Sequence, residues 1–292
     1  MNAANPSAHP TPASRTPLHV IGVGLVVRDL ERVLAFYRDA IGLTVLTRSE
    51  DGARLGVDDV TLVALDHRPD AQPDDRRSAG LYHTAFLMPT RYDLARWVLH
   101  VARHRVPLTG ASDHGVSEAF YLDDPEGNGV EVYADRPPET WQWSDGFVSM
   151  PTKPLDIENL LATADPQSAF NGAPAGVRVG HVHLRVGELA AAERFYSGTL
   201  GLDLTRKRDG AAFMSSGGYH HHVAGNVWHS AGAGLRDSNR SGLAWFSLAA
   251  NDLPALRARF DAAGCPATAT ATGMETRDPW GTILRVTGPS EK

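Results

Sequence analysis

The segments DLERVLAFYRDAIGLTVL (residues 29–46) and ELAAAERFYSGTLGLDLT (residues 188–205) are two copies of one pattern, offset by 159 residues. Each copy carries a Phe-Tyr pair and then a glycine, with apolar residues spaced as in an amphipathic helix. A β-branched run precedes each copy, HVIGVGLVV or VRVGHVHLRV, and the strand-like runs LTVLTRS, ARLGV and VTLVALD follow the first. The pattern therefore predicts a strand, a helix and three further strands in each copy.

A second pair of segments, beginning GLYHTAFLMP and GLAWFSLAAND, has the same plan. Their last strands are preceded by the turn sequences DPEG and DPWG, which lie 154 residues apart. The chain thus contains four βαβββ units, units 1 to 4, at residues 18–66, 81–135, 177–230 and 242–288. We expect a first domain at 18–135, a linker at 136–176 with a short helix at LDIENLLATA, and a second domain at 177–288.

The composition excludes several classes of protein. The chain has 292 residues, a net charge of −6, 42% hydrophobic residues and one cysteine. A mildly acidic chain is a poor nucleic-acid binder, one cysteine allows no internal disulfide, and no apolar run is long enough to span a membrane. Residues 1–17 are rich in Pro, Ala and Asn, so we expect a disordered tail rather than a secretory signal, and a cytoplasmic protein. We expect the Asp-rich stretch 66–77 to be a solvated loop.

The four units, the DL…FY…GL signature and the DPxGN…E ending resemble the vicinal oxygen chelate superfamily, and within it the extradiol (catechol 2,3-) dioxygenases. The resemblance covers nearly all of residues 18–288. It implies an α+β fold in which pairs of units close into two half-open mixed β-barrels around a divalent metal. The metal ligands in this family come from the first and last strands of the units.

At the family's ligand positions, unit 2 offers His83 and Glu131, and unit 3 offers His181. Two histidines and one carboxylate are the ligand set of non-haem Fe(II) oxygenases. A lone strand histidine is more often a hydrogen-bonded polar residue, but an unpaired carboxylate in the apolar run VEVY is costly. The resemblance predicts that these three residues bind the metal. His183, on the same strand face as His181, is the alternative ligand and a predicted substrate contact.

Units 1 and 4 lack these ligands. The corresponding positions hold Gly22 in unit 1, and Leu243 or Trp245 and Arg285 in unit 4. Only units 2 and 3 together complete the ligand set. We therefore expect units 2 and 3 to form the functional barrel, and units 1 and 4 to form the other.

The run YHHH at residues 219–222 is expected to open the last strand of unit 3. Strand alternation would place His220 and His222 on one face and His221 on the other. The resemblance gives His221 the proton-transfer role, with His222 as second choice and His220 as a substrate contact. An imidazole suits this role because it titrates near neutral pH.

The stretch DHGVSEAFYLDDPEGNGVEVY (residues 113–133) resembles the active-site strand pair of the extradiol enzymes. By that resemblance His114 lies near a substrate oxygen and Tyr121 contacts the substrate. Asn226 and Trp228 are expected to line the same pocket.

The resemblance implies Fe(II)-dependent cleavage of a catechol-type diol by O₂, giving a muconic semialdehyde. The ligand set does not distinguish Fe(II) from Mn(II). Two alternatives remain open because one fold hosts several functions: a metal-dependent glyoxalase or lyase, and a non-enzymatic small-molecule-binding protein. The expected partners are a small aromatic diol and O₂, and open sheet edges favour a homo-oligomer.

Overall fold

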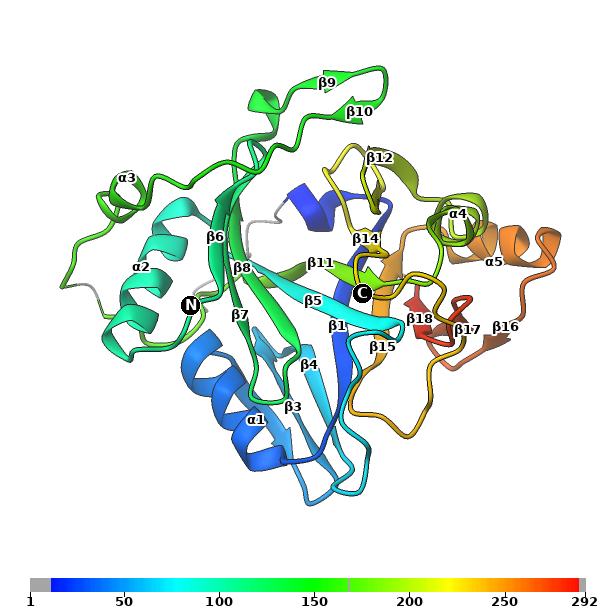
Figure 1. The fold of residues 1–292 in the computed structure, drawn as a ribbon, viewed down its shortest axis with the longest axis horizontal. Helices are drawn as coiled ribbons and strands as arrows, with labels where there is room; N and C mark the ends of the chain where they lie inside the picture. Colours follow the sequence, from blue (N-terminus) through cyan, green and yellow to red (C-terminus); the bar gives the residue numbers. More distant parts are fainter. Residues whose placement is uncertain (1–11, 168, 289–292) are drawn as a thin grey trace, which may run out of the picture.

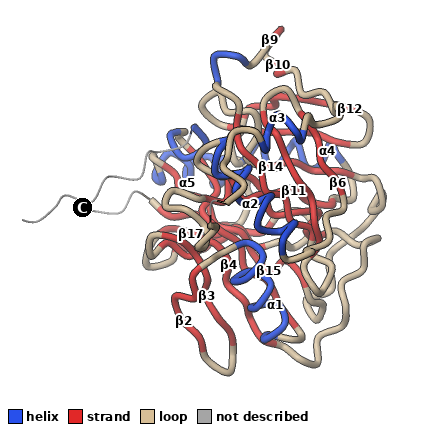
Figure 2. The backbone as a smooth tube through the Cα atoms, turned by 90° about the vertical axis from the view of Figure 1, so that its left-hand side faces the viewer, coloured by secondary structure: helices blue, strands red, loops and turns tan. Residues whose placement is uncertain are grey.

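The computed structural model describes residues 12–167 and 169–288, which form two eight-stranded mixed sheets flanked by helices (Figures 1 and 2). The first sheet contains, in spatial order, β16 (Ala267–Ala269), β17 (Gly273–Arg277), β18 (Ile283–Thr287), β15 (Gly242–Ala250), β1 (Leu18–Val27), β4 (Val60–His67), β3 (Gly52–Val57) and β2 (Thr44–Arg48). The second sheet contains β12 (Asp203–Arg208), β13 (Ala211–Ser215), β14 (Val223–Asn226), β11 (Arg178–Arg185), β5 (Gly80–Leu87), β8 (Gly129–Asp135), β7 (Ser117–Asp123) and β6 (Gly110–Asp113).

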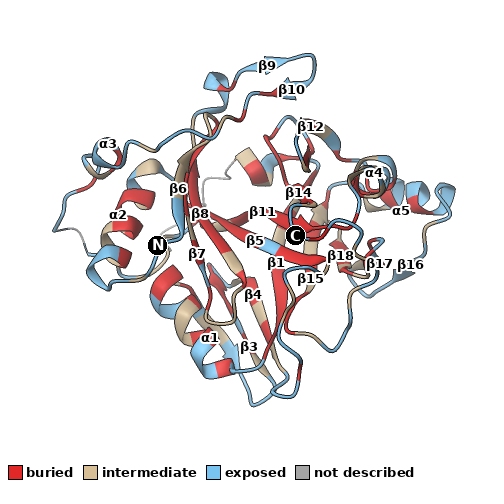
Figure 3. Ribbon diagram, in the orientation of Figure 1, coloured by how far each residue is buried: buried red, intermediate tan, exposed pale blue. Residues whose placement is uncertain are grey.

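The strand order confirms the expected pairing of the units. The first sheet combines units 1 and 4, and the second combines units 2 and 3. The first strands of the paired units run antiparallel, β1 with β15 and β5 with β11. Within each unit the first and last strands are parallel, because a helix returns the chain to the same end of the sheet. The central strands of the two sheets pack against each other, and the strand interiors are buried (Figure 3).

The crossover helices begin and end where the sequence patterns indicate. They are α1 (Leu30–Phe36), α2 (Arg91–Arg103), α4 (Leu189–Glu193) and α5 (Leu253–Ala262). The side chain of Asp29 caps α1 by accepting a hydrogen bond from the Arg32 backbone N–H. In units 1 and 3 the helix widens into one π-turn, at η2 (Tyr37–Ile41) and η4 (Arg194–Thr199). Gly42 ends the first of these at φ +88°, a conformation that favours glycine.

The repeated Phe-Tyr and DPxG motifs meet in space. Tyr37 donates to Asp124 Oδ2 at 3.4 Å, and its counterpart Tyr196 donates to Asp278 Oδ2 at 2.9 Å. Each aspartate is the first residue of a DPxG turn, and its other oxygen accepts hydrogen bonds from backbone N–H groups of that turn. Burial raises the pKa of Asp124 to about 6, despite the hydrogen bonds that oppose it. These contacts join unit 1 to unit 2 and unit 3 to unit 4.

The N-terminal segment differs from the expected disordered tail. Residues 1–11 lie outside the described residues, but Pro12–Arg15 form a 3-10 helix (η1). Ala13 and Thr16 are buried, at 3% and 4% exposure. This segment is ordered because it packs on the loop that precedes β14, as described below.

The Asp-rich stretch 66–77 is not wholly a solvated loop. Asp74 accepts hydrogen bonds from Arg185 Nη2 at 2.5 Å and from Arg236 Nη2 at 2.9 Å. Arg185 is itself buried, so Asp74 balances a charge that would otherwise be costly. The expectation is wrong at Asp74 because its partners are more than 100 residues away in the sequence.

The segment between the halves contains the expected short helix, α3 (Ile157–Leu161). It also contains a two-stranded hairpin, β9 (Trp143–Ser144) and β10 (Phe147–Val148), after a short 3-10 turn, η3 (Pro138–Thr140). The hairpin projects from the body of the molecule (Figures 1 and 2). Among the described residues, no helix is long and apolar enough to cross a membrane.

Candidate metal centre and active site

Three adjacent strands of the second sheet carry the predicted metal ligands: His181 on β11, His83 on β5 and Glu131 on β8. In the strand register, Ala85 of β5 is paired with His181 on one side and with Glu131 on the other. Alternation along β5 places His83 on the same face as Ala85. The small side chain of Ala85 leaves the space between the ligands open.

The geometry of the three side chains fits one metal ion. Glu131 Oε2 lies 3.0 Å from His83 Nε2 and 3.2 Å from His181 Nε2. Ligand atoms at right angles, with bonds of about 2.1 Å to a divalent metal, lie roughly 3 Å apart. All three residues are buried, and among the described residues they are the one group whose ligand atoms converge in this way, within 4.8 Å.

Two buried ring nitrogens at this site have no hydrogen-bond partner. His83 Nε2 and His181 Nδ1 are both unsatisfied among the described residues. A buried unsatisfied nitrogen is costly and calls for an explanation such as a bound ion. His83 Nε2 lies 3.0 Å from Glu131 Oε2 without forming a hydrogen bond, and an ion between the two atoms would satisfy it. The unsatisfied atom of His181 is its other nitrogen, Nδ1, since its Nε2 contacts Glu131.

The charges of the three groups are coupled. Burial raises the pKa of Glu131, but the neighbouring imidazoles of His181 and His83 outweigh it and hold this pKa well below its usual range. Burial lowers the pKa of His181 to about 4, so its imidazole is neutral at pH 7. Neutral imidazoles and an ionised carboxylate are the forms that bind a divalent cation.

A cavity of about 530 Å³ is lined by two of the three predicted ligands, His83 and Glu131. His183 lines it, and its Nε2 accepts a hydrogen bond from the Asn226 side chain at 3.0 Å. His183 is therefore held by Asn226 rather than grouped with the three ligands. Trp228 also lines the cavity, and its ring lies 5.5 Å from the His183 ring. Asn226 is not itself part of the cavity wall and contacts the site through its hydrogen bond to His183.

His114 and Tyr121 meet at the cavity wall. His114 Nδ1 lies 2.9 Å from the Pro151 carbonyl oxygen, and its Nε2 lies 2.7 Å from Tyr121 Oη. The carbonyl can only accept, so Nδ1 carries the proton and Tyr121 donates to Nε2. Tyr121 is paired with Glu131 across β7 and β8, which directs its hydroxyl toward the metal site. Burial, and then the charge of Glu131, raise the pKa of Tyr121 well above 10.

The three consecutive histidines lie in the loop before β14, which begins at Val223. The prediction that these histidines alternate between the two faces of a strand is therefore wrong. Each of the three rings points in a different direction. His221 lines the cavity, and its ring lies against the His181 ring with a centroid separation of 4.0 Å and an angle of 46° between the ring planes. His220 is fully buried behind it and does not line the cavity.

His220 links His221 to a carboxylate. Its Nε2 lies 2.9 Å from Asp135 Oδ1, and its Nδ1 lies 2.8 Å from His221 Nδ1. The Asp135 carboxylate can only accept, so Nε2–H of His220 donates a hydrogen bond to it. Nδ1 of His220 then carries no proton and accepts a hydrogen bond from Nδ1–H of His221. This leaves Nε2 of neutral His221 without a proton. Burial lowers the pKa of His221 well below 6.5, which favours the neutral form.

His222 points away from the cavity into the N-terminal segment. Its Nε2 lies 3.0 Å from the Ala13 carbonyl oxygen, and its Nδ1 lies 2.9 Å from Ser215 Oγ. The Ser216 backbone N–H also donates to Nδ1, at 3.3 Å. Burial lowers the pKa of His222 to about 3. His222 thus fastens the histidine loop to the ordered start of the chain.

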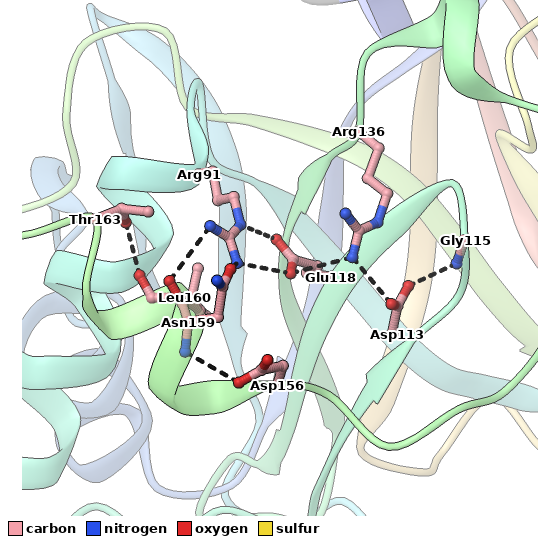
Figure 4. Close-up of polar contacts among 9 residues, drawn as sticks. All are labelled: Arg91, Asp113, Gly115, Glu118, Arg136, Asp156, Asn159, Leu160 and Thr163. Atoms are coloured by element: carbon pink, nitrogen blue, oxygen red, sulfur yellow. Dashed lines mark hydrogen bonds and ion pairs between the residues drawn. The ribbon is translucent and has the colours of Figure 1, made fainter.

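The linker and an ion-pair network support the site, and neither is evident from the sequence. Glu118 is almost fully buried and lies between Arg91 and Arg136 (Figure 4). Its ion-pair distances to these arginines are 2.5 Å and 3.2 Å. Arg136 also pairs, at 2.9 Å, with Asp113, which directly precedes His114 in the chain. Linker residues Met150 and Thr152 line the cavity beside Pro151. The sequence patterns do not indicate Asp135, Pro151 or this ion-pair network, because their contacts join segments that are distant in the chain.

The first sheet holds no comparable group of ligands in the described residues. A Cβ atom at Gly24 would lie 2.1 Å from the Trp245 ring, which fills this part of the sheet. The Arg285 guanidinium lies over the same ring at 4.4 Å and pairs with Glu275. Side chains therefore occupy the positions where the second sheet has its metal ligands.

The comparison with known proteins agrees with this fold. The profile of the glyoxalase/bleomycin resistance protein/dioxygenase superfamily matches residues 17–132 and 178–289. A catechol-2,3-dioxygenase of Bacillus subtilis (strain 168) is 38% identical over 269 residues, covering 89% of this chain and 94% of the relative. A biphenyl-2,3-diol 1,2-dioxygenase 3 of Rhodococcus globerulus is 31% identical over 115 residues, 38% of this chain and 60% of the relative.

Among solved structures, glyoxalase I of Zea mays superposes with a TM-score of 0.57 at 16% identity, covering 94% of each chain. At this identity the likeness concerns the fold alone. The matches of the profile and of the full-length relative show that this chain belongs to the glyoxalase/bleomycin resistance protein/dioxygenase superfamily.

Proposed function

We propose that this protein is an Fe(II)-dependent extradiol dioxygenase that cleaves a catechol-type diol with O₂ to a muconic semialdehyde. The observation that carries the proposal is the convergence of the ligand atoms of His83, His181 and Glu131, two of which, those of His83 and Glu131, belong to residues that line the cavity. The full-length relative named catechol-2,3-dioxygenase supports the same reaction class.

The ligand set fits iron. Two histidines and one carboxylate on adjacent strands leave the side facing the cavity open, as non-haem Fe(II) oxygenases require. When bound, Fe(II) supplies the redox chemistry that lets O₂ react with an aromatic diol. Mn(II) binds to the same ligands, so the ligand set alone does not select the metal. We propose Fe(II) because of the proposed reaction class, and the metal content of the protein tests it.

The side chains around the cavity supply the proton chemistry. His221 presents an unprotonated Nε2, which can take a proton from a substrate hydroxyl. The resulting charge is stabilised through His220 by Asp135. On the other wall, Tyr121 donates to His114, so its hydroxyl oxygen can accept a hydrogen bond from the second substrate hydroxyl. Phe213 and Met150 add apolar surface to the cavity and help to exclude water.

The free Cys265, with no disulfide in the described residues, is typical of a reducing compartment. We propose a cytoplasmic location on this basis. A homo-oligomer, expected from the open edges of the two sheets, stays a prediction.

The test is anaerobic loading with Fe(II), followed by oxygen uptake and a visible spectrum with catechol and alkyl-catechols. We expect oxygen uptake and a yellow ring-fission product. Both should be lost in His83→Ala and Glu131→Ala, with the metal content measured in parallel. Bound iron without oxygen uptake on any diol would contradict the proposal and favour a lyase or isomerase. A protein that binds no metal would favour a small-molecule-binding role.

A further inference from the structure

Arg208 brings a positive charge to the cavity that holds the predicted metal site. It is the last residue of β12 and lines the cavity. Its Nη1 donates to Oγ1 of Thr152 at 3.3 Å, and Thr152 lines the cavity from the linker. The linker therefore holds the guanidinium at the cavity, although Arg208 is exposed to solvent.

The other two arginines that line the cavity each form an ion pair, although Asp74, the partner of Arg185, also pairs with Arg236. Arg76 pairs with Asp123 at 3.1 Å, and Arg185 pairs with Asp74 at 2.5 Å. Arg208 has no ion-pair partner in the described part of the chain, and its side chain donates a hydrogen bond to the neutral hydroxyl of Thr152. Its charge is thus available to an anionic group that enters the cavity.

Arg208 shares its cavity with the residues near the predicted metal site. Glu131, one of the three predicted ligands, and its strand partner Tyr121 both line the cavity that Arg208 lines. A substrate whose hydroxyls lie at the metal ligands would therefore occupy the same cavity as the guanidinium of Arg208.

An aromatic wall lines the same cavity. The Tyr82 and Trp228 rings lie 5.3 Å apart in an edge-on arrangement, and both side chains are exposed to the cavity. The indole N–H of Trp228 already donates to the Asp209 carbonyl oxygen at 3.2 Å. This wall offers ring surface to a substrate, and the neighbouring Arg208 offers charge-assisted hydrogen bonds.

We propose that the substrate is an aromatic diol whose ring substituent ends in a carboxylate, and that Arg208 binds this carboxylate. The inference rests on the proposed dioxygenase function and names its substrate class. The guanidinium donates two parallel hydrogen bonds to a carboxylate, which a neutral substituent of the same shape does not accept with the same strength.

The first test compares 3,4-dihydroxyphenylacetate with its neutral isostere 3,4-dihydroxyphenylacetamide on the Fe(II)-loaded protein. We expect kcat/KM to be about three- to tenfold higher for the acid, a modest preference because the site is open to water. Arg208→Gln should reduce the ratio of acid to amide to near one, and Arg208→Lys should restore part of it. The preference of the wild-type protein should weaken at high salt, which screens exposed charges.

Lys207→Gln is the matched control. It removes the same charge from the neighbouring residue of β12, but Lys207 pairs with Glu193 at 2.8 Å and does not line the cavity. We expect the ratio of acid to amide in this variant to equal that of the wild-type protein.

A second readout does not depend on turnover. Calorimetric titration of the metal-free protein with 4-hydroxyphenylacetate and 4-hydroxyphenylacetamide should show tighter binding of the acid, lost in Arg208→Gln. Equal kcat/KM values for acid and amide, with catechol still cleaved, would overturn this inference and leave the proposed function intact. If no diol is cleaved, the proposed function fails, and equal binding of the two phenols would then overturn the role of Arg208 as well.

Discussion

His220 and His221 are neighbours in the chain, and their Nδ1 atoms lie only 2.8 Å apart, so one imidazole donates to the other. Asp135 decides the direction of this hydrogen bond because its Oδ1 accepts from His220 at 2.9 Å. The carboxylate thereby selects the tautomer of His221 that presents a lone pair to the cavity. Asp135 Oδ1 also accepts a hydrogen bond from Tyr219 Oη at 3.2 Å, whereas Oδ2 is buried with no hydrogen-bond partner among the described residues.

Asp135→Asn should lower kcat about tenfold to a hundredfold with a smaller change in KM. An amide at this position can donate to His220 and reverse the chain of hydrogen bonds, which places a proton on His221 Nε2. General acid–base catalysis contributes about 10²–10⁴-fold, so loss of the correct tautomer should remove much of it. Steady-state kinetics across pH check this, with the exposed Glu139→Gln as control. An unchanged kcat in Asp135→Asn would show that Asp135 does not orient His221.

The metal content of the purified protein should reach one equivalent per chain and no more. The second sheet has its ligands, whereas Trp245 and Arg285 fill the corresponding part of the first. Anaerobic Fe(II) should raise the melting temperature of the wild-type protein, since a ligand at about 100 times its Kd stabilises the folded state by about 2.7 kcal/mol. Glu131→Gln should bind no iron and show no rise. Two equivalents per chain would contradict the assignment of a single site.

Acid should destabilise the metal-free protein, and His222 should contribute to that loss. Burial lowers the pKa of His222 to about 3, from 6.5 in the unfolded chain. Between these values the unfolded chain binds the additional proton, so the free energy of unfolding falls as pH drops from about 6.5 to about 3. His222→Gln removes this titration and should make the fall shallower. It should also cost about 1–3 kcal/mol at pH 7, because its buried partners are left less well paired.

Urea denaturation at pH 7, 5.5 and 4.5 measures this effect. The control is His104→Gln at an exposed position of the surface. An equal pH dependence in His222→Gln and the wild-type protein would show that His222 does not titrate with folding.

Tyr196→Phe should destabilise the protein by about 1–2 kcal/mol, and Tyr37→Phe should destabilise it less. Both hydroxyls donate to a buried aspartate, but the distance is 2.9 Å for Tyr196 and 3.4 Å for Tyr37. A hydrogen bond to a charged group contributes about 1.5–3 kcal/mol, and a long one contributes less. The free energies of unfolding in urea compare the two variants directly. A larger loss in Tyr37→Phe would contradict the ranking.

Much of the fold follows from the sequence because its signals are local. The periodicity of residues 29–46 and 188–205 encodes a helix, and the DPxG sequences encode turns, wherever they lie in the chain. The structure shows why these motifs recur, since Tyr37 and Tyr196 bind the aspartates of the DPxG turns. The pairing of units 2 and 3 was also predictable, because only these units carry ligands that one ion can join.

The directions of the active-site side chains were decided by the tertiary structure. The three histidines at 220–222 have no strand periodicity, so their neighbours alone determine where each ring points: Asp135 for His220, the cavity for His221 and Ala13 for His222. These neighbours come from the end of β8 and from the N-terminal segment, at sequence separations of 85 and 209 residues. Local sequence patterns describe the covalent neighbours of a residue, whereas its protonation and orientation depend on groups that only the pairing of the strands brings within hydrogen-bond distance.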